Sequence, residues 1–523
     1  MTAIQLITGD FGRVRSDHRR PLFTLALAIR MVRRHWAFGI VMAAGVALRV
    51  LAQVAYQPAL LYIDSRKYLI GSNGQEPEGY RVMLRLLDPI GGLGLVVGVQ
   101  HLLGLALAAT VYVLLIRYQA PRWVAAVAAA PVLLDAYQLQ LEQTIMPDVP
   151  FEAVIGAGLA VLIWPRRAQT SRLGQLVAGA LILGVAATIR EIGGVLLVPV
   201  MVLAFLSTAG WRRRAGHTAL AAGCFLLPIL IHMVGYLALT GHFNLVHSGP
   251  GPEYGRAAAA ADCKTLSLPA NERGLCVSYA QIVALGGVDG LLHNPESPAV
   301  TVKVPPGSTR EKLLASFSLA VLRQQPLRVA GSVLGDAARL FALTRDGNPM
   351  VTAIARWQFS TSPPYYPKMY PKWFYTKLDP AAANGDVVAV PALAQFLRDY
   401  QLNGGYTPGP LFLAGLILGV AGSLAGMVRR RTLSPDGAWL ARVSLLVTLS
   451  AIVLLISSDA FEFSWRYQLP AVILLPLGGA LGLVALRATR PNWTLGIRSR
   501  PADLQADQVG VHDAVRAGEP PSP

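Results

Sequence analysis

Apolar stretches long enough to cross a bilayer recur along this chain, and they constrain its fold more than any other feature. The hydrocarbon core of a membrane is about 30 Å thick, and an α-helix crosses it with about 20 residues. Of the 523 residues 53% are hydrophobic and 14% are charged, whereas soluble proteins carry roughly 25% charged residues. The runs lack the apolar-polar alternation of barrel strands. The sequence therefore predicts an all-α polytopic membrane protein.

We expect about ten transmembrane helices, divided into two groups by a long polar region. The apolar segments lie at about 37–56, 93–116, 123–135, 149–164, 173–189, 191–210, 218–239, 410–428, 438–456 and 469–486. The chain then divides into a basic N-terminus (1–36), an N-terminal membrane module (37–239) with its first outer loop at 57–92, an extracytoplasmic region (240–407), C-terminal helices (408–488) and a disordered tail (489–523).

Arginine clusters determine the expected orientation in the membrane. Clusters such as Arg212–Arg214 and Arg429–Arg431 lie in short connections between the apolar segments. Short loops rich in arginine stay on the cytoplasmic side of a membrane. The basic flank that ends in Arg30, Arg33 and Arg34 predicts a cytoplasmic N-terminus. When the sides alternate from there, every tight cluster falls inside and the C-terminus is expected to be cytoplasmic too. This placement explains the net charge of +17 without a nucleic-acid partner.

The same alternation brings polar side chains to the outer face, where a functional site could form. The candidates stand at the ends of apolar segments: Asp64, Lys67, Tyr68, Glu142, Asp148, Arg190, Glu191 and Arg466. A carboxylate there can act as a general base, and guanidinium groups can stabilise charge on a departing phosphate. Structural explanations stay open. Asp64 or Asp148 could cap a helix, Arg190 and Glu191 could form an ion pair, and Arg466 could be an interfacial anchor.

The long polar region holds two features that predict local structure. Cys263 and Cys276 lie near each other in it, and a disulfide between them fits an oxidising outer compartment; two free thiols are the alternative. Residues 311–343 carry apolar residues at helical spacing. They predict one or two amphipathic helices at the membrane interface, broken at Pro326.

The polar motifs of the outer face resemble those of the GT-C superfamily of polytopic glycosyltransferases. Counterparts there are an Asp in the first outer loop (Tyr62-Ile-Asp64-Ser-Arg-Lys-Tyr68), a second acidic outer turn with Glu142 and Pro147-Asp148, and the run Arg466-Tyr467-Gln-Leu-Pro470. The long outer region with interfacial helices has a counterpart too. The likeness points to the bacterial protein-mannosyltransferase-like and arabinosyl- or aminoarabinosyltransferase-like branches, which use polyprenyl-phosphate sugars as donors.

This resemblance implies transfer of a sugar, with inversion, from a polyprenyl-phosphate donor to an envelope glycan, lipid or protein outside the membrane. Asp64 would be the general base. Arg190 and Arg466 would hold the donor phosphate, and Glu142 or Asp148 would orient the acceptor or hold a divalent metal. Many members have Asp-Glu or Asp-Asp where this chain has Asp64-Ser65, so metal dependence stays open. Membrane lipid is the other expected partner.

Two other classes of function stay open at this stage. A transporter or flippase of a lipid-linked or anionic solute would carry charges in mid-span and broken helices in paired positions. The sequence shows charges mainly at the ends of the segments and no internal repeat. A non-catalytic membrane assembly factor would not depend on Asp64.

Overall fold

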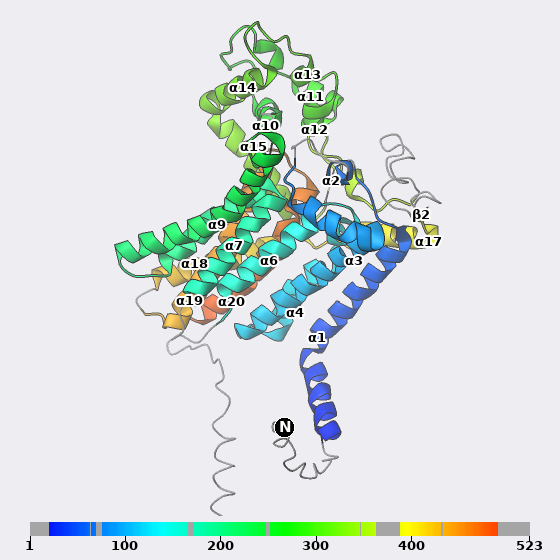
Figure 1. Cartoon of the computed structure of the whole chain (residues 1–523), viewed down its shortest axis with the longest axis vertical. Coiled ribbons are helices and arrows are strands. Elements are labelled where there is room, and N and C mark those ends of the chain that lie inside the picture. Colours follow the sequence, from blue (N-terminus) through cyan, green and yellow to red (C-terminus); the bar gives the residue numbers. More distant parts are fainter. Residues whose placement is uncertain are drawn as a thin grey trace, which may run out of the picture.

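The computed structural model describes residues 20–62, 64–69, 76–165, 172–246, 251–345, 347–361, 388–429 and 432–489. A bundle of long helices carries a group of shorter helices at one end (Figure 1). Within the described residues the sheet consists of β1 (Tyr56–Gln57) and β2 (Val388–Ala389), paired antiparallel. The predictions for residues 1–19 and for the tail from residue 490 lie outside the described part.

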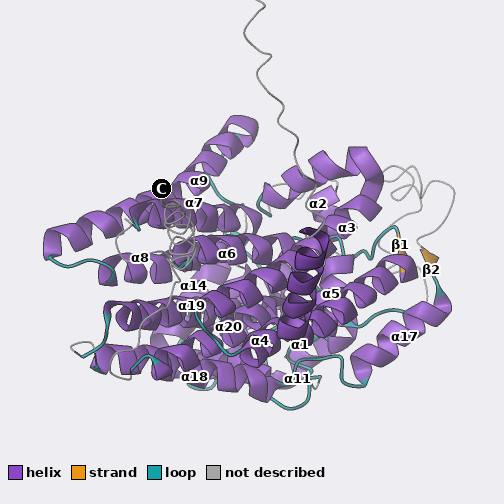
Figure 2. Ribbon diagram, turned by 90° about the horizontal axis from the view of Figure 1, so that it is seen from below, coloured by secondary structure: helices purple, strands orange, loops and turns teal. Residues whose placement is uncertain are grey.

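Six helices of the described chain are long and apolar enough to span a membrane. They are α1 (Arg20–Ala55), α3 (Gly79–Arg117), α9 (Trp211–Thr240), α18 (Gly409–Val428), α19 (Pro435–Asp459) and α20 (Leu469–Arg487). The pair α4 (Arg122–Leu134) and α5 (Ala136–Gln143) passes the same test with a 46° bend between its halves and makes a seventh if it is one span. In the view from below, α20 lies inside the bundle, against α4, α18 and α19 (Figure 2). The prediction of an all-α polytopic membrane protein is confirmed.

The remaining three expected segments are helices of modest length. They are α6 (Asp148–Ile163), α7 (Leu173–Ile189), and the 3-10 helix η1 (Glu191–Leu196) that continues into α8 (Leu197–Leu206). They pack in sequence, α6 on α7 and both α7 and α8 on α9. Each expected segment is thus helical, while six, or seven with the bent pair, have the length of a span.

The first outer loop is shorter than the predicted range 57–92, because α3 already begins at Gly79. A bend at Gly91 and Gly92 separates its first turns from its apolar part. Pro89 lacks a backbone N–H for the helix, and Gly92 takes a φ of 66°, which glycine adopts without steric cost. The first turns contain Arg81 and Arg85, so their charges made a helix resemble a polar loop.

The short helices outside the bundle are α10 (Gly251–Ala260), α11 (Tyr279–Leu285), α12 (Gly287–His293), α13 (Pro298–Thr301), α14 (Arg310–Gln324) and α15 (Pro326–Ala338). They have a core of their own, with Tyr254, Leu291 and Phe317 fully buried. The predicted break at Pro326 is confirmed, and the apolar face of α14 packs on α10. Farther along the chain, α17 (Pro391–Leu402) follows β2 and packs on α1.

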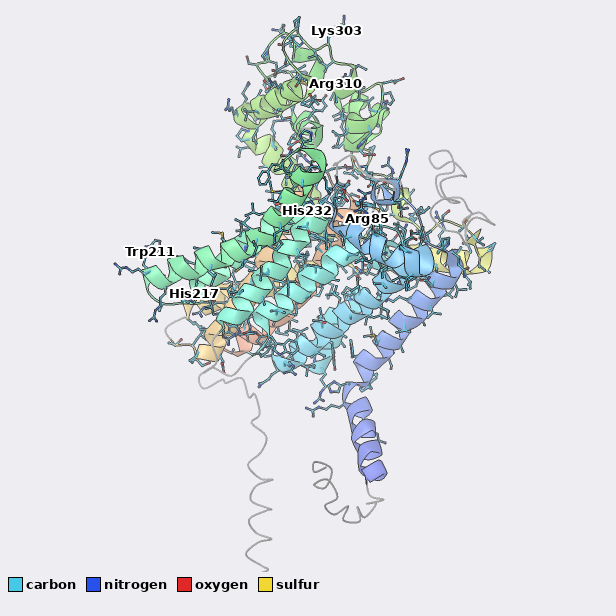
Figure 3. The ribbon with its side chains drawn as sticks, viewed as in Figure 1. Arg85, Trp211, His217, His232, Lys303 and Arg310 are labelled. Carbon is cyan, nitrogen blue, oxygen red and sulfur yellow. A yellow bond between two sulfur atoms is a disulfide. The ribbon has the colours of Figure 1, made fainter. Side chains whose placement is uncertain are left out.

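Connections expected on opposite sides of the membrane gather at opposite ends of the bundle. Trp211, which begins α9, lies far from Lys303 and Arg310 of the α10–α15 group (Figure 3). At the end away from that group, the Tyr118 hydroxyl donates to the carbonyl of Ile163 and accepts a hydrogen bond from Trp439 at 3.1 Å. The guanidinium of Arg172 stacks 3.7 Å from the centre of the Trp439 ring. Three loops are therefore joined there, as the alternation of sides requires.

The predicted disulfide is confirmed: Cys263 and Cys276 are bonded, and Cys224 is free.

We expect a membrane-impermeant maleimide to label Cys263 and Cys276 in intact cells, because the expected orientation puts α10–α15 outside. Labelling should require prior reduction, because the disulfide blocks both thiols. The measurement is a gel shift of the tagged protein, with Cys224→Ser as the control that leaves the signal unchanged. If labelling also required permeabilised cells, α10–α15 would lie on the cytoplasmic side, which contradicts the expected orientation.

Candidate active site

Asp64 lies at the start of α2 (Ser65–Leu69), on a segment fixed to the connection between α5 and α6. The backbone N–H of the buried Leu60 donates to the carbonyl of Gln143 at 2.9 Å, and the carbonyl of Leu60 accepts a hydrogen bond from the backbone N–H of Ile145 at 3.0 Å. The Ser65 hydroxyl donates to the carbonyl of Ile145 at 2.9 Å. Backbone and side-chain bonds on both sides therefore hold Asp64 beside the start of α6.

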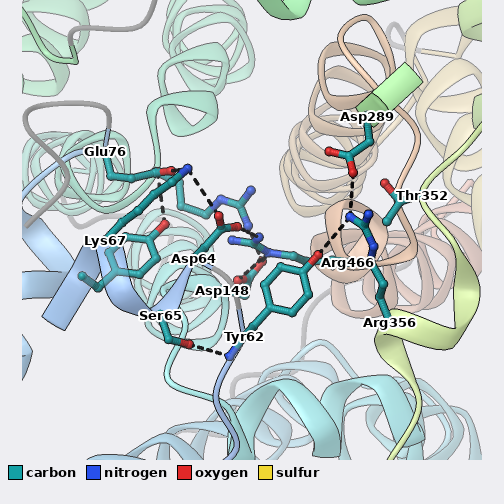
Figure 4. Close-up of polar contacts among 12 residues, drawn as sticks. Tyr62, Asp64, Ser65, Lys67, Glu76, Asp148, Asp289, Thr352, Arg356 and Arg466 are labelled. Atoms are coloured by element: carbon teal, nitrogen blue, oxygen red, sulfur yellow. Dashed lines mark hydrogen bonds and ion pairs between the residues drawn. The ribbon is translucent and has the colours of Figure 1, made fainter. Parts of the chain in front are cut away.

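A chain of alternating charges links Lys67, Asp64, Arg466, Asp148 and Arg190. Figure 4 shows the first four of these residues. One Asp64 oxygen lies 3.3 Å from Lys67 Nζ and the other 2.8 Å from Arg466 Nη1. Arg466 Nε donates to Asp148 Oδ2 at 3.0 Å, and Arg190 also pairs with Asp148. Arg466 and Asp148 are buried, while Asp64 is 21% exposed. The structure thus brings these five sequence candidates together in one cluster.

The surroundings of Asp64 keep it ionised at neutral pH. Burial raises the pKa of its carboxyl, but Arg466 and Lys67 outweigh burial and hold the pKa below its usual range. Burial lowers the pKa of Lys67, which Asp64 and Glu76 in turn raise above its usual value. Glu76 lies 3.4 Å from Lys67 and accepts a hydrogen bond from Tyr68 at 3.1 Å. Tyr68 therefore acts on this site through Glu76.

Local structure explains where the two arginines point. Arg466 belongs to a 3-10 turn, η6 (Trp465–Gln468), directly before α20. Its guanidinium lies 5.5 Å from the ring centre of Tyr467, and that of Arg190 lies 5.2 Å from the same ring. Asp148 stands in the first turn of α6, where the helix dipole favours a negative charge. A cavity of about 10 Å³, room for one water molecule, adjoins Asp148, Arg190 and Tyr467.

Glu142 does not join this cluster, although the sequence groups it with Asp148. It is fully buried, accepts hydrogen bonds from Arg49 at 2.6 Å and Gln138 at 3.1 Å, and lies 2.9 Å from His101. A Cβ on Gly104 would collide with its carboxylate, so a glycine makes room for it. Glu142 is thus placed in a polar network that joins α1, α3 and α5, which the sequence did not predict.

Glu191 also stands apart from the cluster. It is exposed at the start of η1, and Arg190 pairs with Asp148 instead. The alternative of an Arg190–Glu191 ion pair is therefore not what we find. The alternative that Asp148 caps α6 is not found either. The carboxylate of Asp148 pairs with Arg190 and Arg466, and the N-terminus of α6 has no side-chain cap hydrogen bond.

The described residues do not form a metal site. No group of three or more His, Cys, Asp or Glu side chains in that part of the chain is arranged to hold an ion. The two carboxylates of the cluster, Asp64 and Asp148, have the guanidinium of Arg466 between them, where a bridging cation would have to lie.

A second polar group lies across Asp64 from Lys67 (Figure 4). Asp289 of α12 lies 2.7 Å from Arg356 Nη1 and 3.1 Å from His293 Nδ1. The Thr352 hydroxyl donates to Glu462, whose pKa burial raises to about 7. Burial raises the pKa of Asp289, but the effects of His293 and Arg356 outweigh that of burial and hold this pKa below its usual range. No local motif in the sequence connects these residues.

Comparison with known proteins gives distant likenesses. No family model and no curated protein matches the chain. Among solved structures, the S. cerevisiae protein O-mannosyltransferase Pmt1-Pmt2 complex is 15% identical over 42% of this chain and 36% of that one, with a TM-score of 0.31. The oligosaccharyltransferase AglB from Archaeoglobus fulgidus is 12% identical over 94% and 53%, with a TM-score of 0.38. ArnT from Cupriavidus metallidurans is 16% identical over 86% and 77%, with a TM-score of 0.29.

The matched part thus covers about a third to a half of the first two relatives. Likenesses at these identities and TM-scores assign no activity to the chain.

Proposed function

We propose that this multi-pass membrane protein is a glycosyltransferase of the GT-C kind, which moves a sugar from polyprenyl phosphate to an envelope acceptor. The observation that carries the proposal is the alternation Lys67–Asp64–Arg466–Asp148–Arg190 at one end of the membrane helices. It combines an ionised, partly exposed carboxylate with three cations, which suits a reaction that takes a proton from a hydroxyl and releases a phosphate.

Asp64 is the base in this mechanism. It accepts the proton of the acceptor hydroxyl while that oxygen bonds to the anomeric carbon of the sugar. The bond from the anomeric carbon to the phosphate oxygen breaks, and polyprenyl phosphate leaves with the bonding electrons. Attack from the side opposite the phosphate inverts the anomeric carbon. The Ser65 hydroxyl donates a hydrogen bond to the carbonyl of Ile145 and accepts one from the backbone N–H of Tyr62, and it thereby orients the backbone that presents Asp64.

The three cationic side chains of the site have two different roles, orientation of the carboxylates and binding of the donor phosphate. Arg466 is 5% exposed and uses Nε and Nη1 on the two carboxylates, so its role is to orient Asp64 and Asp148. Lys67 is 33% and Arg190 18% exposed. We therefore assign the donor phosphate to these two side chains. Charge-assisted bonds to phosphate are stronger than neutral ones, and they gain strength as negative charge builds on the leaving group.

One observation favours a transporter as the second candidate. The bend between α4 and α5 resembles a broken helix, and it lies beside the buried charges of Arg49 and Glu142. Transporters of this design have broken helices in paired positions, and the described residues hold one bent pair. Glu142 is moreover fixed by several partners. A glycosyltransferase accounts for the charged cluster around Asp64, which a transporter does not require.

The pH dependence of transfer tests the assignment of Asp64. We expect the rate to fall on the acid side, because protonation of Asp64 removes the base. Lys67→Met should move this acid limb to higher pH, since Lys67 helps to hold the pKa of Asp64 down. The measurement is transfer at saturating donor from pH 2 to pH 8, because the pKa of Asp64 lies below its usual range. Lys303→Met, at an exposed position just after α13, is the control. An acid limb unmoved by Lys67→Met would contradict the assignment.

A further inference from the structure

We propose that Asp289, His293 and Arg356 form the acceptor-binding wall of this site, and that the acceptor is a hydroxyl-rich glycan. The inference rests on the proposed function and specifies its second substrate. In Figure 4 Asp289 and Arg356 stand on one side of Asp64 and Arg466, and Lys67 and Glu76 on the other. With the donor phosphate on the Lys67 side, the opposite wall is left for the acceptor.

The wall is built from two segments that the fold brings together. Asp289 and His293 lie in α12, and Arg356 lies in η4 (Ile354–Trp357). The backbone N–H of Val288 donates to the carbonyl of Met350 at 3.1 Å, which fastens α12 to the stretch before η4. Asp289 then bridges the two segments, with one oxygen on Arg356 and the other on His293.

Contacts continue from this wall to the proposed base. Arg356 Nη1 lies 3.5 Å from the hydroxyl of Tyr62, two residues before Asp64. The ring of Trp357 lies 4.5 Å from that of Tyr62, and the guanidinium of Arg466 lies 5.8 Å from Trp357. A ligand held by Arg356 is therefore held next to the segment that presents Asp64.

The wall offers polar groups suited to sugar hydroxyls. Within the described residues, the hydrogen bonds of Arg356 use Nη1 and those of His293 use Nδ1; the other nitrogens of these two side chains are the ones we assign to a ligand. Their side chains are 33% and 70% exposed, and that of Asp289 is 19% exposed. A sugar hydroxyl is both donor and acceptor, so neighbouring hydroxyls can pair with such a mixed group. An acceptor with one hydroxyl on an alkyl chain would leave these polar groups unpaired, which costs affinity.

Acceptor kinetics in the purified full-length protein test the wall. The probes are octyl mannoside, which carries several hydroxyls, and octanol, which carries one, each with the same polyprenyl-phosphate sugar. We expect His293→Ala and Asp289→Asn each to raise the KM for octyl mannoside about tenfold, the loss of one charge-assisted hydrogen bond. The Kd of polyprenyl phosphate should stay within twofold of wild type. Glu296→Gln, an exposed carboxylate just after α12, is the matched control.

Three results would overturn the inference. The first is an unchanged KM for octyl mannoside in both variants, and the second is an equal rise for octanol. The third is a lower melting temperature with normal acceptor kinetics, which would make the Asp289–Arg356 pair a brace between α12 and η4. His293→Ala separates the third case from the proposal, because this exposed side chain contributes little to folding. If wild type transfers sugar to no acceptor, the proposed function fails as well.

Discussion

Replacing Asp64 with Asn is expected to slow sugar transfer by about 10²–10⁴-fold, the usual contribution of a general base. Asn keeps the size of the side chain but cannot accept the acceptor proton. The Kd of polyprenyl phosphate should change little, because the phosphate is assigned to Lys67 and Arg190. The measurement is the transfer of radiolabelled sugar by the purified protein, with a panel of polyprenyl-phosphate sugars as donors.

Glu311→Gln, at the exposed start of α14, serves as the control for a lost carboxylate. Full activity in Asp64→Asn would place the base elsewhere. A wild-type protein that binds lipid-linked sugar and moves it across vesicles, but transfers nothing, would favour the transporter.

Replacing Arg466 with Met is expected to destabilise the protein by about 3–5 kcal/mol, the usual cost of breaking a buried ion pair. Arg466 is 5% exposed, and its loss would take from Asp64 and Asp148 a partner that they share. Thermal unfolding in detergent measures the effect. Arg466→Lys should recover part of the stability but little activity, because one ammonium cannot reproduce the two-sided bonds of a guanidinium.

The double variant Arg466→Met with Asp148→Asn sharpens this test. Removing the charge of Asp148 should restore part of the stability lost in Arg466→Met, because fewer unpaired charges stay buried. The two changes should therefore be non-additive, as expected for residues in contact. Additive losses would mean that the two side chains do not interact in the folded protein.

Much of the site was predictable because its residues stand at the ends of apolar segments. The alternation of sides needs only the segments and the arginine clusters, and it put Asp64, Asp148, Arg190 and Arg466 on one face. Cys263 and Cys276 were paired from their common place in the polar region. These inferences depend on properties that are local in the sequence.

The alternation of sides says which face a residue lies on, but not where its side chain points. Glu142 and Asp148 come from the same outer turn, yet one faces Arg49 inside the bundle and the other faces Arg466. The pair Asp289–Arg356 joins residues 67 positions apart, and no periodicity predicts such a contact. The first turns of α3 were missed because charged residues on an exposed helix resemble a loop.

The short helices beside the site have a consequence for the lipid around it. The helix α6 has 16 residues and α7 has 17, so each is about 24–26 Å long at 1.5 Å per residue. The hydrocarbon core is about 30 Å thick, and a bilayer next to short helices thins to match them. Asp148 begins α6 and Arg190 follows α7. We expect thinning there to bring the headgroup layer toward these residues, so that the phosphate of the proposed donor could reach them without leaving its leaflet.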